Sequence, residues 1–315
     1  MTRTVIARQY GDISELDIED LPAVPLEPGQ VRVAVRAAAI NPADLKRLRG
    51  EFGRSEKSLP LRLGSEVSGV VIEVAQDAVG PAGQIAVGDE VVGYPVSGGF
   101  AAEVVAKAGS VLPKPASLGW SQAAGLLLAA VTAFHLVEAA AVGEGDRVIV
   151  HGASGAVGSA AVQLARLRGA EVIGTVSAGR EEALRAFGAV PVLYGPGLED
   201  RLRALLPDGA DAALDTVGSD EALDASVALV RDRSRVATVA GFARAAELGI
   251  QLLGSGPGAD PGTALRSEAR LPMLRLAGDG LLIGPPVIEF PLDQFQNAMT
   301  LVSSGHAGGK VVLLP

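Results

Sequence analysis

The sequence predicts an α/β protein with a small β-barrel and a doubly wound parallel sheet. Before residue 118, short valine-rich segments alternate with proline and glycine turns, as in a small barrel. After that point, strand and helix patterns alternate, which favours a parallel sheet covered by helices. Between residues 147 and 166, a β-branched run enters a glycine turn and then a helical stretch. These features together indicate a nucleotide-binding α/β fold beside a β-rich domain.

Composition limits the function classes. The 315 residues favour two domains, and 48% apolar residues can bury a sizeable core. The net charge of −9 argues against nucleic acid or an anionic membrane as the main partner. With no cysteine, the chain has no disulfide and no thiolate zinc site, and its three histidines are far apart in sequence, so we expect no metal.

The cellular location is expected to be cytoplasmic. The first residues are too polar for a signal peptide. An apolar stretch at 123–142 is interrupted by Thr132, His135 and Glu138, which favours a buried helix over a membrane span.

The N-terminal part contains five predicted strands and one predicted short helix. The strands are expected at 4–8, 31–38, 66–74, 90–92 and 101–106. Asn41 or its neighbour caps the helix, and Pro42 fits its first turn.

From Ser117 the pattern changes. Ser121 is a suitable N-cap for a helix to about residue 128, and a second helix begins near Thr132 and ends before Gly143. Six strands then match a dinucleotide fold, at 147–151, 171–176, 190–193, 212–216, 235–240 and 250–253. The helices between them are expected at 156–168, 179–187, 198–206 and 219–230. Helices at 264–276 and 292–303 and a strand at 310–314 return the chain to the first domain.

The glycine turn is the strongest functional signal. It has the form A-x-G-x-x-G, with Ala153 in place of the usual first glycine. A tight turn and a helix N-terminus offer backbone N–H groups to a pyrophosphate. The expected contacts are Gly152, Ala153, Ser154, Gly155, Ala156, Val157 and Gly158. The alternative is a tight turn without a ligand.

The second strand of this sheet indicates the cofactor. An NAD site usually has a carboxylate at its tip, whereas here the strand ends in Ser177-Ala-Gly-Arg180. Arg180 can form charge-assisted bonds to a 2′-phosphate, so we expect NADPH. The alternative for Arg180 is a solvated residue in the first turn of a helix.

Seven ordered blocks, covering nearly the whole chain, resemble the zinc-independent branch of the medium-chain dehydrogenase/reductase superfamily, the quinone oxidoreductase group. The blocks are Asn41-Pro-Ala-Asp44, Leu63-Gly-Ser-Glu-Val-Ser-Gly-Val-Val71, Gly88-Asp-Glu-Val-Val-Gly93, Gly98-Gly-Phe-Ala-Ala-Glu103, Thr132-Ala133, the glycine turn and Ser304-Gly-His-Ala-Gly-Gly-Lys-Val-Val312. The resemblance implies a GroES-like catalytic domain at 1–118 and 262–315, a Rossmann domain at 119–261, and NADPH in the cleft between them. Gly64-Ser65-Glu66 departs from the glycine-aspartate of the family.

The resemblance also implies roles for single residues. It places Asn41 near the nicotinamide ribose, Thr132 near the nicotinamide and Tyr194 at the phosphate. Gly241 and Phe242, after the fifth strand, are expected under the cofactor. The alternatives are a helix cap for Asn41, a helix N-terminal residue for Thr132 and a packing tyrosine for Tyr194. His306 and Lys310 match the closing motif, either in a structural turn or in catalysis.

No general acid is evident. The family often has a tyrosine near position 52, where this chain has Phe52. Tyr94 is a candidate, and Lys46 and Arg49 are near the same expected wall. An enolate can take its proton from water, so we expect no required acid.

The resulting expectation is an NADPH-dependent reductase of quinones or α,β-unsaturated carbonyls. The alternatives are an enoyl-thioester reductase of a biosynthetic pathway and a non-catalytic NADPH-binding sensor. The apolar edge strand Ile250-Gln-Leu-Leu253 predicts a homodimer.

Overall fold

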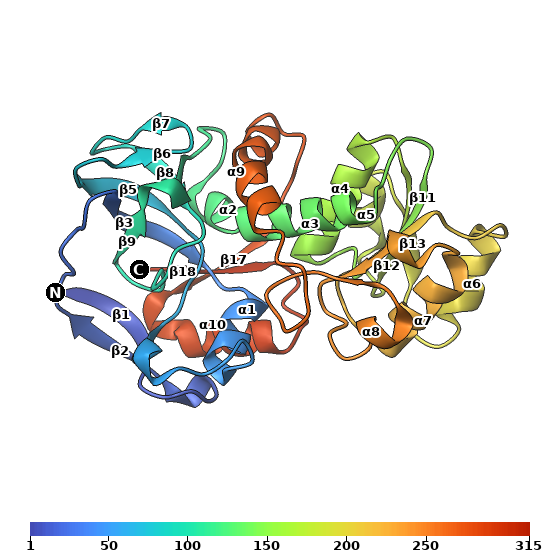
Figure 1. The fold of residues 1–315 in the computed structure, drawn as a ribbon, viewed down its shortest axis with the longest axis horizontal. Helices are drawn as coiled ribbons and strands as arrows, with labels where there is room; N and C mark the ends of the chain where they lie inside the picture. The colour runs from blue at the N-terminus through green and yellow to red at the C-terminus, as the bar shows by residue number, and fades with distance from the viewer. The chain divides into compact units, whose positions relative to one another are not determined.

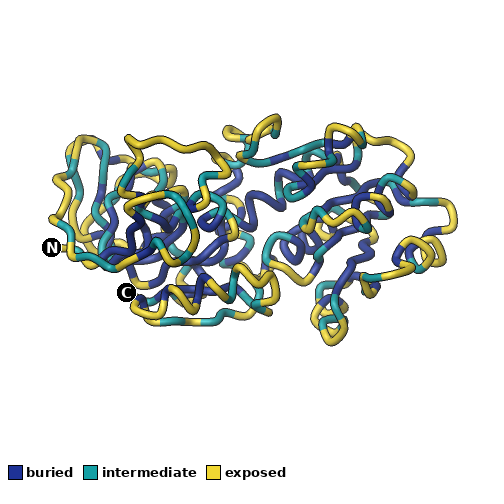
Figure 2. Tube along the Cα trace, turned by 90° about the horizontal axis from the view of Figure 1, so that it is seen from below, coloured by how far each residue is buried: buried dark blue, intermediate teal, exposed yellow.

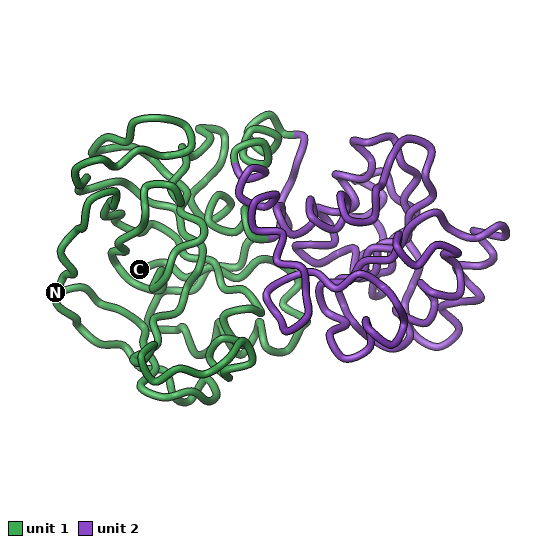
Figure 3. The backbone as a smooth tube through the Cα atoms, viewed as in Figure 1, with its two compact units in different colours: residues 1–128, 271–280, 286–315 green, residues 129–270, 281–285 purple.

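The computed structural model describes all 315 residues and divides into two compact units (Figure 3). Unit 1 comprises Met1–Leu128, Leu271–Gly280 and Pro286–Pro315, and unit 2 comprises Ala129–Arg270 and Leu281–Pro285. These limits differ from the expected boundaries at 118 and 262. Residues 120–124 form helix α2, which belongs to unit 1 because it packs on the strands of that unit. The Trp120 carbonyl accepts a 2.7 Å hydrogen bond from Ser68 Oγ there.

Unit 1 is the β-rich part of the predicted α/β fold. Its largest sheet has the order β10-β8-β5-β3-β18-β17, with β9 also pairing with β3 (Figure 1). The strands are β1 Thr2–Ala7, β2 Leu16–Leu21, β3 Gln30–Ala39, β4 Leu61–Arg62, β5 Val67–Val74, β6 Val79–Gly80, β7 Gly83–Gln84, β8 Glu90–Gly93, β9 Glu103–Lys107, β10 Val111–Pro113, β17 Val287–Pro291 and β18 Lys310–Leu314. The helices are α1 Pro42–Arg49, α2 Trp120–Ala124 and α10 Phe295–Ser303.

The closing strand β18 completes this sheet, as predicted. It pairs antiparallel with β3 and parallel with β17. Alternate residues of β3 point into the core, where Val31, Val33 and Val35 are buried. This alternation is the pattern expected of a strand with one buried face. Figure 2 shows the buried segments running through the interior and the exposed residues at the loops.

Unit 2 contains the doubly wound parallel sheet. Its strand order is β13-β12-β11-β14-β15-β16, and every pairing is parallel. The strands are β11 Arg147–His151, β12 Glu171–Val176, β13 Val190–Leu193, β14 Ala212–Asp215, β15 Val236–Thr238 and β16 Gln251–Leu252. The helices are α4 Ala156–Leu167, α5 Glu181–Ala186, α6 Leu198–Leu205, α7 Asp220–Leu229 and α8 Ala245–Leu248. The predicted fold class is confirmed.

Two helices extend across the limits of the units. Helix α3 spans Leu127–Ala139 and helix α9 spans Thr263–Gly278. The remaining turns of helix are the short 3₁₀ segments η1 Ile13–Glu15, η2 Glu56–Ser58, η3 Ala108–Ser110, η4 Arg233–Arg235 and η5 Leu292–Gln294.

Two predicted helix starts are wrong. Thr132 lies inside α3, so it is not a helix N-terminal residue. The run from Leu127 to Val131 is apolar and buried on most sides, and this burial extends the helix upstream of Thr132. Ser121 lies inside α2, whose N-cap is Gly119, and the Ser121 hydroxyl donates to Glu289 Oε1 at 2.5 Å. The sequence pattern also missed β2, β10 and β17, and the two-residue strands β4, β6 and β7.

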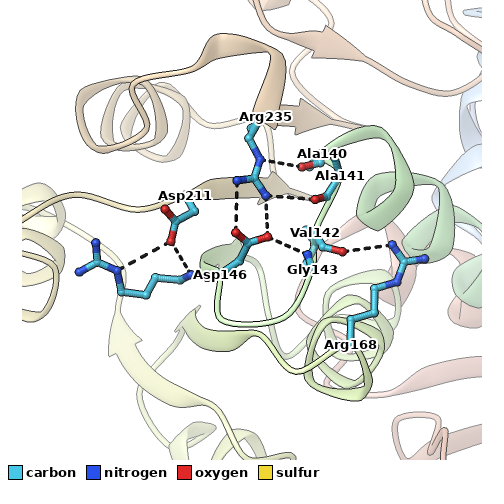
Figure 4. A network of polar contacts seen from close by, with 9 residues as sticks. Ala140, Ala141, Val142, Gly143, Asp146, Arg168, Asp211 and Arg235 are labelled. Atoms are coloured by element: carbon cyan, nitrogen blue, oxygen red, sulfur yellow. Dashed lines mark hydrogen bonds and ion pairs between the residues drawn. The ribbon is translucent and has the colours of Figure 1, made fainter.

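Within unit 2, the partly buried guanidinium of Arg235 joins the segment after α3 to Asp146, just before β11 (Figure 4). Arg235 pairs with both carboxylate oxygens of Asp146 at 2.6 and 3.2 Å, and it donates to the carbonyls of Ala140 and Ala141 at 3.1 Å each. Burial would raise the pKa of Asp146, but the hydrogen bonds from Arg235 and Gly143 outweigh it and lower that pKa. The pair therefore keeps both charges at neutral pH.

None of the helices combines the length and the apolar character that crossing a membrane requires.

Candidate functional site

The turn after β11 is closed too tightly for side chains. Gly152 has φ of +71°, and a Cβ at this position would lie 2.6 Å from atoms of both Thr216 and Val217. A Cβ on Gly158 would lie 2.1 Å from the carbonyl oxygen of Gly152. The helix that starts here can lie against the turn only because both positions are glycine.

The N–H groups of the turn are bonded within the protein, and the start of α4 supplies the donors for an anion. The N–H of Ala153 donates to the Thr175 carbonyl at 3.0 Å, which holds the turn against β12. The N-cap of α4 is Gly155, which has no side chain to cap the helix. Because the first N–H groups of an α-helix have no acceptor within it, those of Ala156, Val157 and Gly158 point toward a ligand position. N–H groups of this kind are the donors that a diphosphate needs.

The turn lies where the strand order of the sheet reverses. Strand β11 pairs with β12 on one side and β14 on the other, and the chain moves outward in both directions from there. In open α/β sheets, ligands bind at this crevice, beyond the carboxyl ends of the strands. The nucleotide site expected from the sequence therefore has the position that the topology favours.

Ser177, Arg180 and Tyr194 come from neighbouring strand ends. Leu193 pairs with Val176, and the Tyr194 N–H donates to the Val176 carbonyl at 3.1 Å. The Arg180 N–H closes a turn onto the Ser177 carbonyl at 3.2 Å. Tyr194 is 51% exposed, which makes a core-packing role untenable for its ring. None of these three residues is a carboxylate.

The fifth strand is followed by a loop organised by Asp215. Its carboxylate is fully buried and accepts from the N–H groups of Val217 and Gly218 and from Thr238 Oγ1. Thr238 Oγ1 in turn accepts from the Gly241 N–H at 2.8 Å. Phe242 packs on the backbone of Gly256, where a Cβ would meet its ring at 2.0 Å. Gly241 and Phe242 thus lie on a braced loop at the carboxyl edge of the sheet.

Thr132 belongs to a polar cluster within unit 2. Arg266, near the start of α9, donates to Thr132 Oγ1 at 3.4 Å and to His135 Nδ1 at 3.1 Å. His135 Nε2 is 3.4 Å from Asp260. Burial lowers the pKa of His135, and the charge of Arg266 lowers it further. No sequence pattern predicts this cluster, because its members come from separate segments of the chain.

Asn41 lies in a buried charged cluster of unit 1. Asn41 is the N-cap residue of α1, and its backbone N–H donates to Asp44 Oδ2 at 2.8 Å, as in a capping box. Its side-chain Oδ1 accepts from Lys310 Nζ at 2.5 Å. Lys310 Nζ also lies 3.7 Å from Glu66 Oε2. The predicted alternative, a helix cap at Asn41, agrees with the structure, because Asn41 is the N-cap residue of α1.

Burial dominates the titration of both carboxylates in this cluster. It raises the pKa of Asp44 to about 6, although the Asn41 N–H and the charge of Lys310 act in the opposite direction. It also raises the pKa of Glu66, against the charge of Lys310 and the hydrogen bond from the Leu128 N–H. One ammonium thus faces two buried carboxyl groups.

The remaining candidates are less enclosed. Tyr94 directly follows β8, is partly buried, and its N–H donates to the Ser110 carbonyl at 2.9 Å. Phe52 is 40% exposed. His306 is exposed in the turn before β18, whereas Lys310, four residues on, is buried. No group of three His, Cys, Asp or Glu side chains is arranged to hold a metal ion.

Two domain families match the sequence. The alcohol dehydrogenase GroES-like domain matches residues 27–116, and the family described as zinc-binding dehydrogenase matches residues 156–256. The first match lies in unit 1, and the second covers the glycine turn and most of the parallel sheet of unit 2.

Two curated relatives differ greatly in length. The spectinabilin polyketide synthase system protein NorB of Streptomyces orinoci is 33% identical over 320 residues, covering 96% of this chain and 14% of that protein. The 2-methylene-furan-3-one reductase of Solanum lycopersicum is 31% identical over 326 residues, covering 97% of this chain and 77% of that protein. The chain thus spans about a seventh of the first relative and most of the second.

Solved structures share the whole fold. The quinone oxidoreductase from Coxiella burnetii superposes with a TM-score of 0.82 at 27% identity, covering 100% of this chain and 99% of that one. A mycobacterial protein in complex with NADPH superposes with a TM-score of 0.85 at 27% identity, covering 100% of both chains.

Proposed function

Because this chain belongs to the medium-chain dehydrogenase/reductase family, of the quinone oxidoreductase type, we propose that it uses NADPH to reduce a quinone or an α,β-unsaturated carbonyl. The observation that carries the proposal is the nucleotide end of unit 2. There, the glycine turn leads into α4, whose first N–H groups have no acceptor within the helix. The neighbouring tip of β12 has Ser177 and Arg180 but no carboxylate.

The choice of NADPH over NADH depends on charge. A carboxylate at the tip of β12 would repel a 2′-phosphate, and this chain has a serine there. Arg180 and Tyr194 supply a cationic group and a hydroxyl at the same sheet edge. The NADPH complex of the mycobacterial structural relative supports this choice.

The protein's contribution to the reaction is placement and electrostatics. When bound, NADPH supplies the hydride. The backbone of residues 152–158 would hold the diphosphate, and the braced Gly241–Phe242 loop and Thr132 would support the rest of the cofactor. Asn41 would bind the nicotinamide ribose through its side-chain amide. Water supplies the proton to the enolate, so Tyr94 is dispensable for turnover.

An α,β-unsaturated carbonyl suits the relatives as well as a quinone does. The name of the tomato enzyme describes a ketone conjugated to a methylene group. The polyketide synthase relative favours the second candidate, reduction of an enoyl thioester in biosynthesis. A non-catalytic NADPH-binding sensor is the third candidate, since Phe52 stands where a tyrosine is common in the family.

One experiment separates these candidates. The purified chain is titrated with NADPH and NADH by fluorescence, and NADPH oxidation is then followed at 340 nm with quinones, enones and an enoyl thioester. We expect tight binding of NADPH, weak binding of NADH and turnover of quinones or enones. Turnover of the thioester alone would favour the biosynthetic role, and binding without any turnover would favour the sensor. Equal affinity for the two nucleotides would contradict the cofactor assignment.

A further inference from the structure

The loop after β13, which carries Tyr194, is held by two charged side chains of unit 2. Gly195 lies between them with φ of +103°, a conformation that favours glycine. Its N–H donates to Glu221 Oε2 at 3.0 Å, and its carbonyl accepts from Arg201 Nη2 at 2.7 Å. Glu221 lies in the first turn of α7, and Arg201 lies in α6. A carboxylate and a guanidinium from two helices therefore bind the two backbone polar groups of one residue.

All three guanidinium nitrogens of Arg201 bind carbonyls of this loop. Besides Gly195, the carbonyl of Leu193 accepts from Nε at 3.1 Å and from Nη2 at 2.9 Å, and the carbonyl of Pro196 accepts from Nη1 at 2.9 Å. A guanidinium presents its donors in a fixed planar fork, whereas an ammonium is a single point of charge. The contacts of Arg201 thus depend on its shape as well as on its charge.

The same loop fixes the backbone of Tyr194 beside the tip of β12. Val176 pairs with Leu193 at the ends of the two strands, and the Tyr194 N–H donates to the Val176 carbonyl at 3.1 Å. Tyr194 and Ser177 are therefore the next positions along neighbouring strands. Tyr194 is 51% exposed, and both residues that flank it in the chain have a carbonyl bound by Arg201. A shift of this loop would move Tyr194 relative to Ser177.

We propose that Arg201 and Glu221 are positioning residues, which hold Tyr194 at the 2′-phosphate of NADPH and so contribute to the discrimination against NADH. The proposal rests on the proposed function, because it assumes that Tyr194 binds this phosphate. Both side chains act through the backbone of the loop, and all of the residues involved belong to unit 2.

The decisive comparison is between Glu221→Gln and Glu221→Ala. Both variants remove the same negative charge, but only glutamine keeps an oxygen that can accept from the Gly195 N–H. By charge alone, both would bind a phosphate more tightly. We expect Glu221→Gln to bind NADPH at least as tightly as the wild type and Glu221→Ala to bind it about tenfold more weakly, with little change for NADH in either. Fluorescence titration measures the affinities, next to the melting temperature of the nucleotide-free protein.

The corresponding change in α6 is Arg201→Lys, which keeps the positive charge and removes the planar fork. We expect it to weaken NADPH binding by about tenfold and to leave NADH binding nearly unchanged. In a Tyr194→Phe background it should have no further effect on NADPH affinity, because Arg201 acts through the tyrosine.

Two controls change charges on the same helices at residues whose ion pairs lie elsewhere. Arg203→Met in α6 breaks a pair with Glu199 at 2.6 Å, and Asp220→Ala in α7 breaks a pair with Arg244 at 3.0 Å. Neither variant should change the preference for NADPH over NADH.

Two failures are distinguishable. If the wild type does not prefer NADPH to NADH, both the cofactor assignment of the proposed function and this proposal are overturned. If the wild type prefers NADPH and the folded Glu221→Ala and Arg201→Lys variants keep that preference, the two side chains are only structural and the proposed function stands. A further loss of NADPH affinity on Arg201→Lys in the Tyr194→Phe background would also overturn the positioning role.

Discussion

Gly158 approaches the backbone of Gly152 so closely that a Cβ on Gly158 would lie 2.1 Å from the Gly152 carbonyl oxygen. The first turn of α4 therefore rests directly on the chain leaving β11. This contact places the N–H groups at the start of α4 beside the glycine turn. The proposed diphosphate site therefore depends on it.

The first prediction concerns Gly158→Ala. The added methyl group must push the helix away from the turn, so we expect a loss of stability of about 2 kcal/mol, within the range for overpacked positions, and a strong loss of NADPH affinity. Chemical denaturation and fluorescence titration measure the two effects. Gly109→Ala is the control, because a Cβ there meets nothing within 4 Å, and it should change neither value.

The second prediction concerns Arg180→Ala. A charge-assisted hydrogen bond is worth about 1.5–3 kcal/mol, so NADPH affinity should fall by about ten- to a hundredfold. NADH affinity should barely change, since NADH has no 2′-phosphate. Titrations with both nucleotides check the result.

The neighbouring Arg185→Ala variant controls for a general change of charge. Arg185 lies in the last turn of the same helix α5 and pairs with Glu182 at 3.5 Å. It should affect NADPH affinity little. Equal losses for NADPH and NADH in Arg180→Ala would show that the residue acts on the fold and not on the phosphate.

The third prediction concerns the guanidinium of Arg235. Arg235→Met removes its bonds to Asp146 and to the carbonyls of Ala140 and Ala141, leaving a mostly buried carboxylate without its cation. We expect unfolding to become easier by about 2–4 kcal/mol at neutral pH, as measured by urea denaturation. Arg203→Met, which breaks an exposed pair with Glu199, should cost only about 0.5 kcal/mol. Similar costs for the two variants would contradict the prediction.

The order of elements in unit 2 could be predicted from the sequence because local signals and long-range structure agree there. Buried parallel strands are continuous apolar runs, and glycines such as Gly152 and Gly158 mark the turn. Strands β2 and β17 were missed because their residues are largely exposed or intermediate, without regular alternation. The start of α3 was misplaced because Thr132 resembles a cap, while burial of the preceding residues decides the helix.

The charged cluster of unit 1 could not be predicted in the same way. The sequence shows Asn41 before a proline, which is a common capping pattern, and Lys310 before a strand, which is a common edge pattern. Only the pairing of β18 with β3 brings these positions together, and this pairing has no local signature. The contact between Arg266 and Thr132 could not be predicted either, since it joins two helices that are far apart in the chain.

The last prediction is a pH dependence that comes from Asp44. Burial raises its pKa from 3.8 to about 6, so the folded protein holds a proton that the unfolded chain has lost between these values. The stability from this group is complete below about pH 4 and is lost as the pH rises through about 6, which amounts to about 3 kcal/mol at most. Lys310 and Glu66 face the same group, so the comparison is between wild type and Asp44→Asn. The variant costs stability at all pH values, because Asp44 accepts from both Asn41 and Gly64. Its cost should nevertheless be smaller at pH 7 than at pH 5 in urea denaturation. An equal cost at pH 5 and pH 7 would contradict the prediction, because it would show that Asp44 is ionised in the folded protein throughout this range.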